Sequence, residues 1–157
     1  MEKGRVQMKS TKAQLKSRGY IEDQALDAYR SFSKEALLQL LNSKEATDRT
    51  IGAKLLEQFV DKSVLDAMLS TLLTEKKLYT KIALSESIAS QGVIACEALI
   101  KHLGQIGQNQ YHTLPDVPFK KKRYPLPRDI ISRTLCKIGV PAYQSTSFEA
   151  CALYRTY

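Results

Sequence analysis

Apolar residues recur along this chain at intervals of three and four positions, which is the spacing of one face of an α-helix. Three stretches of this kind, at residues 34–41, 65–73 and 96–104, align with one another when the sequence is shifted by 31 positions. Four sets of apolar residues, here called columns, coincide after this shift. The pattern therefore predicts one type of helix that is repeated along the chain. The columns are Ala36, Ala67 and Ala98; Leu37, Met68 and Leu99; Leu38, Leu69 and Ile100; and Leu41, Leu72 and Leu103.

A second type of helix alternates with the first. Residues 49–60, 81–92 and 128–139 each begin with a cation and carry their own stripe, and residues 22–32 form an earlier, looser copy. No run alternates between apolar and polar residues and no Asn-Gly or Asp-Gly turn occurs, so β-strands are not expected. The stripes consist of Gly52, Leu55, Leu56 and Phe59; of Leu84, Ser87, Ile88 and Gln91; of Ile131, Thr134, Leu135 and Ile138; and, in the looser copy, of Ala25, Ala28, Tyr29 and Phe32.

Several helix ends are marked by residues that cap helices. Ser63, with Asp66 three residues later, predicts a capping box at the start of the helix over 65–73. Gly92 and Gly139 stand where a glycine is favoured after the last turn of a helix.

Helices this short cannot bury their apolar stripes alone, so successive pairs must stack. We therefore expect an all-α fold, an α-solenoid of stacked antiparallel helix pairs. A cation, then small or apolar residues at three-residue intervals, then Ile-Gly resembles the HEAT and HEAT-like (armadillo-type) repeats of bacterial proteins, most clearly in RDIISRTLCKIG at 128–139. The resemblance implies about 3.5 repeats and says little about activity. Ser87 and Gln91 depart from the motif, so their helix is expected to pack loosely or out of phase.

The pattern divides the chain into a basic N-terminal segment (1–20), a HEAT-like repeat domain (21–139) and a C-terminal closing segment (140–157). A length of 157 residues suits a single domain. The period breaks once, before the last helix, where a proline-rich basic loop is inserted at 108–127. Prolines cannot continue a helix, and loops of this length are usually functional or lack a fixed structure.

The net charge of +8 comes from two segments. Residues 1–20 carry a net +5 and residues 120–137 a net +6, which leaves the other 119 residues at −3. The excess positive charge therefore bears on what these two segments bind and not on the surface as a whole.

Two interpretations of the inserted loop are open. In the first, the aromatic rings of Tyr111, Phe119 and Tyr124 fold back onto the helices and the cations only keep the loop in water. In the second, the loop is an extended arm whose cations hold phosphates or an acidic protein, while a ring stacks on a base or packs against the partner. The candidate binding residues are Phe119, Lys120, Lys121, Lys122, Arg123, Tyr124 and Arg128.

Signatures of catalysis are missing. The chain has no GxSxG, P-loop or GxGxxG motif, and its two histidines, His102 and His112, lack metal-ligand spacing. HEAT-like hydroxylases depend on His-Glu pairs for two iron ions, and HEAT-like DNA glycosylases depend on tryptophans and a catalytic aspartate in a basic groove. This chain has no such pair and no Trp. We therefore expect no enzyme activity, no metal and no other cofactor.

The cysteines and the lengths of the apolar runs bear on the compartment of the protein and on membrane contact. Cys96, Cys136 and Cys151 lie among apolar residues, which predicts buried, reduced thiols in a cytoplasmic protein. The N-terminus lacks the apolar core of a secretory signal, and no apolar run is long enough to span a bilayer.

These observations favour a non-catalytic protein-binding or scaffolding module whose specific contacts come from the 108–127 insertion. The alternative is a nucleic-acid-binding module that uses the basic N-terminus and the 120–137 basic segment. We expect a protein partner first, nucleic acid second and no membrane. We also expect self-association through the C-terminal end if the aromatic residues there leave an apolar edge uncovered.

Overall fold

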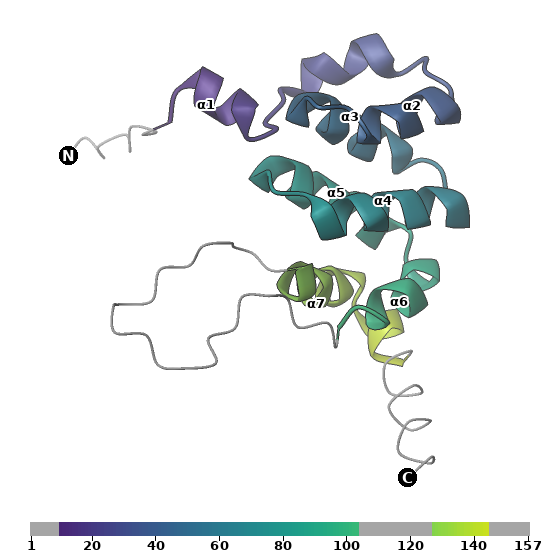
Figure 1. The fold of residues 1–157 in the computed structure, drawn as a ribbon. Coiled ribbons are helices and arrows are strands. Elements are labelled where there is room, and N and C mark those ends of the chain that lie inside the picture. Colours follow the sequence, from purple (N-terminus) through teal and green to yellow (C-terminus); the bar gives the residue numbers. More distant parts are fainter. Residues whose placement is uncertain (1–9, 104–126, 145–157) are drawn as a thin grey trace, which may run out of the picture.

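The computed structural model describes residues 10–103 and 127–144, and in this part of the chain the fold is all-helical (Figure 1). No strand occurs among these residues, so the all-α prediction is confirmed. Residues 140–144 add a short helical segment after the last long helix. The elements are α1 (Lys12–Ser17), η1 (Asp23–Tyr29), α2 (Lys34–Leu41), α3 (Ala46–Leu56), α4 (Lys62–Thr74), α5 (Leu78–Ser90), α6 (Val93–Ile100) and α7 (Pro127–Ile138).

The helices from α2 onward form two layers. In one layer α3 contacts α5 and α5 contacts α7, and in the other α2 contacts α4 and α4 contacts α6. Figure 1 shows the resulting tiers one below another, α2 with α3, then α4 with α5, then α6 with α7. None of the described helices is long and apolar enough to cross a membrane.

The pairing of helices differs in one respect from the sequence pattern. The pattern pairs each helix of the first type with the helix before it, whereas in the structure α2 and α4 approach most closely the helix that follows. The short connection 42–45 turns the chain straight back after α2. Gly52 then allows α3 to come close, because a Cβ at this position would lie only 3.0 Å from the Leu37 carbonyl oxygen.

Two of the four aligned columns of apolar residues have the same burial in every tier. Leu37, Met68 and Leu99 are all fully buried, and the preceding alanines of the three helices are all half-buried. In the other layer, Leu84 and Ile131 occupy corresponding places and are also fully buried. The apolar periodicity of the sequence therefore identifies the core of the molecule correctly.

The segment before α2 differs from its prediction. The sequence pattern predicts a helix with a buried stripe over 22–32, but η1 is a 3₁₀ helix without a buried residue, and Ala25 and Ala28 are exposed. The segment lies against α3 at the end of the stack, where it has no further described tier to pack against. The prediction of a buried helical face over 22–32 is therefore wrong.

The short helix α1 is not predicted by the apolar periodicity. Thr11 and Gln14 form a capping box at its start, and Leu15 is buried. After the helix, the Tyr79 N–H donates to the Arg18 carbonyl oxygen at 3.1 Å. The second half of the basic N-terminal segment is thereby fixed to α5, while residues 1–9 lie outside the described part.

Helix ends agree with the sequence in two places and differ in one. Gly92 and Gly139 follow α5 and α7 with φ of 63° and 81°, as C-terminal glycines do. The N-cap of α4 is Asp61, which accepts a hydrogen bond from the Ser63 N–H, so the capping box predicted at Ser63 is not formed.

Candidate functional site

Most of the candidate binding residues predicted from the sequence fall outside the described ranges. These are Phe119, Lys120, Lys121, Lys122, Arg123 and Tyr124. Arg128 is described: it is the second residue of α7, its side chain is exposed, and its Nε lies 3.9 Å from Asp129 Oδ1. The contact arm proposed for the 108–127 insertion therefore stays a prediction.

A groove of about 500 Å³ runs between α4 and α6. Leu65 and Leu69 of α4 line it and are buried, whereas Val93 and Ile94 at the start of α6 are 59% and 51% exposed. Aliphatic side chains left exposed along a groove are typical of surfaces that bind other proteins. We therefore take this groove as the candidate site.

Val93 and Ile94 are the first two residues of α6, directly after the short connection from α5. α5 ends at Ser90 and α6 begins at Val93, directly after Gly92 with its positive φ. One period earlier in the sequence, Lys62 and Ser63 occupy the positions of Val93 and Ile94. Aliphatic residues in place of polar ones at corresponding positions are the signal by which the groove could have been found from the sequence.

Four charged residues also line the groove: Lys62 and Asp66 from α4, Glu97 from α6, and Lys101 directly after α6. All four are exposed, and none forms an ion pair with another residue in the described part of the chain. Asp66 and Glu97 are 31 positions apart and thus occupy equivalent places on their helices. The groove combines an aliphatic lining with charges that are not neutralised within these residues.

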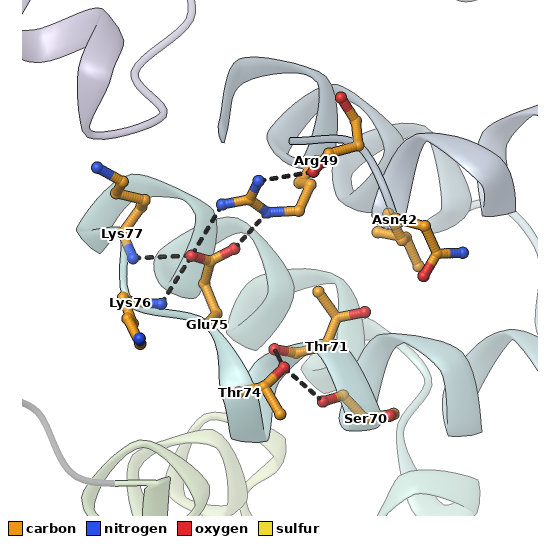
Figure 2. Close-up of a pocket in the computed structure, with 10 residues that line it drawn as sticks. Asn42, Arg49, Ser70, Thr71, Thr74, Glu75, Lys76 and Lys77 are labelled. Atoms are coloured by element: carbon orange, nitrogen blue, oxygen red, sulfur yellow. Dashed lines mark hydrogen bonds and ion pairs between the residues drawn. The ribbon is translucent and has the colours of Figure 1, made fainter. Parts of the chain in front are cut away.

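A second, polar cleft of about 390 Å³ opens beside the connection between α4 and α5 (Figure 2). It contains an ion pair in which Arg49 Nε and Nη2 lie 2.7 and 3.1 Å from the two carboxylate oxygens of Glu75. Arg49 also donates to the carbonyl oxygens of Ser43 and Lys44, at 2.8 and 3.0 Å. The guanidinium thus links the connection before α3 to the connection before α5.

The carboxylate of Glu75 is buried and has further donors. It accepts hydrogen bonds from the backbone N–H groups of Lys76 and Lys77 at 2.7 and 2.8 Å, as Figure 2 shows. Burial raises the pKa of Glu75, but the hydrogen bonds from Arg49 and the two N–H groups together outweigh it and lower the pKa below its ordinary value. Because both partners are already engaged, this pair fastens two connections together and is not a ligand site.

The three cations that begin the second helix type have different surroundings. Arg49 is held in the ion pair with Glu75 and Arg128 is exposed. Lys81 is buried, and burial lowers its pKa below the ordinary value, an effect that the nearby charge of Glu75 offsets only in part. Their shared position in the sequence therefore does not create a common cationic surface.

The described cysteines and histidine do not form a reactive cluster. Cys96 is buried as predicted, and its thiol donates to the Gly92 carbonyl oxygen at 3.7 Å. Cys136 is exposed, because it follows Leu135 on the outward side of the α7 stripe. His102 is half-buried beside the groove. Within the described ranges, no group of three or more His, Cys, Asp or Glu residues is placed to hold a metal ion.

Comparison with known proteins adds nothing to this geometry: no family model, no curated protein and no solved structure matches the chain. The resemblance to HEAT-like repeats therefore stays a prediction from the sequence motif. The function has to be argued from the surface of the molecule.

Proposed function

We propose that this chain is a non-catalytic protein-binding or scaffolding module built on HEAT-like repeats. Its helix pairs form an α-solenoid, which is a rigid support for a binding surface. The groove between α4 and α6 is the surface by which it holds a protein partner.

The repeat architecture is supported by the burial pattern. Leu37, Met68 and Leu99 follow one another at intervals of 31 residues and are all fully buried. Each layer of helices also continues from one tier to the next, with α3, α5 and α7 in one row. Contacts between successive neighbours are the way in which solenoid proteins build a continuous core.

The observation that carries the protein-binding function is the exposure of Val93 and Ile94 beside the groove. Exposing two adjacent aliphatic side chains has a cost in water, roughly 25 cal/mol for each Å² of apolar surface. A partner that covers this surface recovers that free energy, and Leu65 and Leu69 already provide a packed apolar lining.

Nucleic-acid binding is the second candidate, and the excess charge of the two basic segments favours it. In α7, however, the cations have acidic neighbours: Arg128 lies 3.9 Å from Asp129, and Lys137 lies 3.8 Å from Glu86. Phosphate contacts here would compete with these carboxylates. We therefore rank this function below protein binding.

The test is affinity capture from an extract of cells that express the protein naturally. The bait is wild type, a groove variant with Val93→Ser and Ile94→Ser, or a control with Leu78→Ser and Ile82→Ser, two exposed aliphatic residues of α5. We expect wild type and control to retain a protein that nuclease does not release and that the groove variant loses.

Salt separates the two candidate functions. Binding through several phosphate contacts falls by about 10³-fold or more between 50 and 200 mM salt, whereas an apolar interface changes little. A partner that nuclease removes, or equal capture by all three baits, would contradict the proposed function.

A further inference from the structure

The charges beside the groove indicate what the partner presents there; this step rests on the protein-binding function proposed above. Some charges elsewhere in the chain are paired closely, as in Lys34–Asp61 at 2.9 Å. Lys62, Asp66, Glu97 and Lys101 are exposed and have no such partner within the described part of the chain. Their charges are therefore available to a bound protein.

The two acidic residues lie between the two lysines. Asp66 follows Lys62 by one helical turn on α4, and Glu97 precedes Lys101, the C-cap of α6, by four residues. Because α4 and α6 contact each other and Asp66 and Glu97 hold equivalent positions, the carboxylates belong to the same level of the groove. A cation that enters between two carboxylates makes charge-assisted hydrogen bonds, which are among the stronger polar contacts.

The lining sets the shape of the occupant. Helices that bind in grooves place aliphatic residues at intervals of three and four against the groove and charges along its edges. Val93, Ile94 and Leu69 provide the apolar contacts for such a stripe. We infer that the groove binds an amphipathic helix of another protein, which sets a lysine or arginine between Asp66 and Glu97 and aliphatic side chains against Val93 and Ile94.

Two other occupants fit less well. A second copy of this chain related by a twofold axis through the groove centre would bring Asp66 and Glu97 against the same two carboxylates, which repel one another. Nucleic acid would bring phosphates toward these carboxylates, which is also repulsive. A basic helix from a different protein meets neither obstacle.

The test is selection from a phage-displayed library of 16-residue amphipathic helices, in which the aliphatic stripe is fixed and the central flanking positions vary. The full chain is the target, at 150 mM salt. We expect enriched peptides to carry lysine or arginine at the central position. Binding of the synthetic peptide should weaken at least 10-fold in a variant with Asp66→Lys and Glu97→Lys.

Matched controls make this result specific. A variant with Glu45→Lys and Glu57→Lys has the same change in net charge at two exposed positions outside the groove, and it should bind the peptide like wild type. A peptide whose central cation is changed to glutamate should bind the Asp66→Lys and Glu97→Lys variant better than it binds wild type.

Several outcomes would overturn the inference. Enrichment of neutral or acidic central residues, or equal binding by the charge-reversed variant, rejects the basic helix, although the protein-binding function stands if Val93→Ser and Ile94→Ser still abolish binding. A wild-type dimer that these two serine substitutions dissociate identifies the groove as a self-interface instead. If no groove-dependent peptide is selected and the protein binds single-stranded RNA instead, both proposals are rejected.

Discussion

Ser87 of α5 and Gln91, the C-cap of that helix, are both buried. Each has an oxygen atom, Ser87 Oγ and Gln91 Oε1, without a hydrogen-bond partner in the described structure. The sequence motif favours small or apolar residues at these two positions, and their departure from it predicted loose or out-of-phase packing. The structure keeps both residues on the buried stripe, 1% and 4% exposed. The helix is therefore in phase with the repeat. The departure from the motif leaves two buried oxygen atoms without hydrogen-bond partners.

Replacing Ser87 by alanine should leave the protein as stable as wild type or stabilise it by up to about 1 kcal/mol, because a buried hydroxyl without a partner is removed. Ser85 on the same helix is the matched control. Its Oγ lies 2.8 Å from Thr134 Oγ1, so Ser85→Ala should destabilise by about 1 kcal/mol. Urea denaturation compares the two variants; a larger loss for Ser87→Ala than for Ser85→Ala would show that Ser87 has a partner after all.

Gly19 lies where the chain after α1 meets the rest of the molecule. Its φ is 86°, and a Cβ built there would be 2.9 Å from Thr50 Oγ1 and closer still to Thr80 Oγ1. The two threonine hydroxyls are 3.0 Å apart, and each donates to the Ala46 carbonyl oxygen. No side chain fits without disturbing this buried group.

Gly19→Ala should therefore lower the free energy of unfolding by at least about 2 kcal/mol, since steric overlap is added to the strain of a left-handed alanine. Gly139→Ala provides the control, because Gly139 has a similar φ of 81° but a Cβ there meets nothing within 4 Å. Its cost should be strain alone, about 1 to 2 kcal/mol. Equal losses in a denaturation experiment would mean that Gly19 does not pack against Thr80 in solution.

At the scale of the element, the start of α4 depends on a charged cap. Asp61 accepts a hydrogen bond from the Ser63 N–H at 2.7 Å, and its other oxygen lies 2.9 Å from Lys34 Nζ. The hydrogen bonds from Lys34 and Ser63 lower the pKa of Asp61 from 3.8 to about 2. The carboxylate thereby joins the first turn of α4 to the first turn of α2.

Because the pKa of Asp61 is lower in the folded state than in the unfolded one, its contribution to stability is complete above about pH 4. It is lost as the pH falls toward about 2. We expect Asp61→Asn, which keeps a capping oxygen, to have a shallower fall in urea midpoint over this range than wild type. Asp66→Asn, on the exposed face of the same helix, should behave as wild type does; identical pH profiles for all three proteins would refute the assignment.

The sequence predicts the helices of this fold better than their ends. Apolar periodicity is a property of each helix, so α4 over 62–74 and α5 over 78–90 are recognised, whereas a cap depends on which neighbour comes near. Asp61 takes the capping role from Ser63 because Lys34 lies next to it in space. The helix α1 is not predicted for the same reason: Leu15 is its one buried residue, and the helix that it packs against, α3, is distant in the sequence.

For the whole molecule, the aligned column of Leu37, Met68 and Leu99 runs through all three tiers of the core. Met68→Ala should therefore destabilise the fold by about 2 to 5 kcal/mol, because a cavity remains in a densely packed interior. Leu78→Ala removes an aliphatic side chain that is 44% exposed and should cost only about 0.5 kcal/mol. Similar losses for the two variants in thermal or urea unfolding would mean that the column does not form the core.

The candidate site was predicted less well than the core. The charges and prolines of the 108–127 insertion stand out in the sequence, but its candidate residues 119–124 lie outside the described part of the chain. The groove is formed by residues from two helices, and only their packing brings Asp66 and Glu97 together. The exposed pair Val93 and Ile94 becomes visible in sequence only after it is aligned with Lys62 and Ser63.

The most direct test of the central claim, that the groove between α4 and α6 holds a protein, is photo-crosslinking in cells that express the chain naturally. A photoreactive amino acid replaces Ile94 in the groove or, in a second strain, Ile82 on the exposed side of α5. We expect a discrete protein adduct from position 94, resistant to nuclease and absent from position 82. No adduct at position 94, the same adducts at both positions, or an adduct that nuclease digests would contradict the central claim.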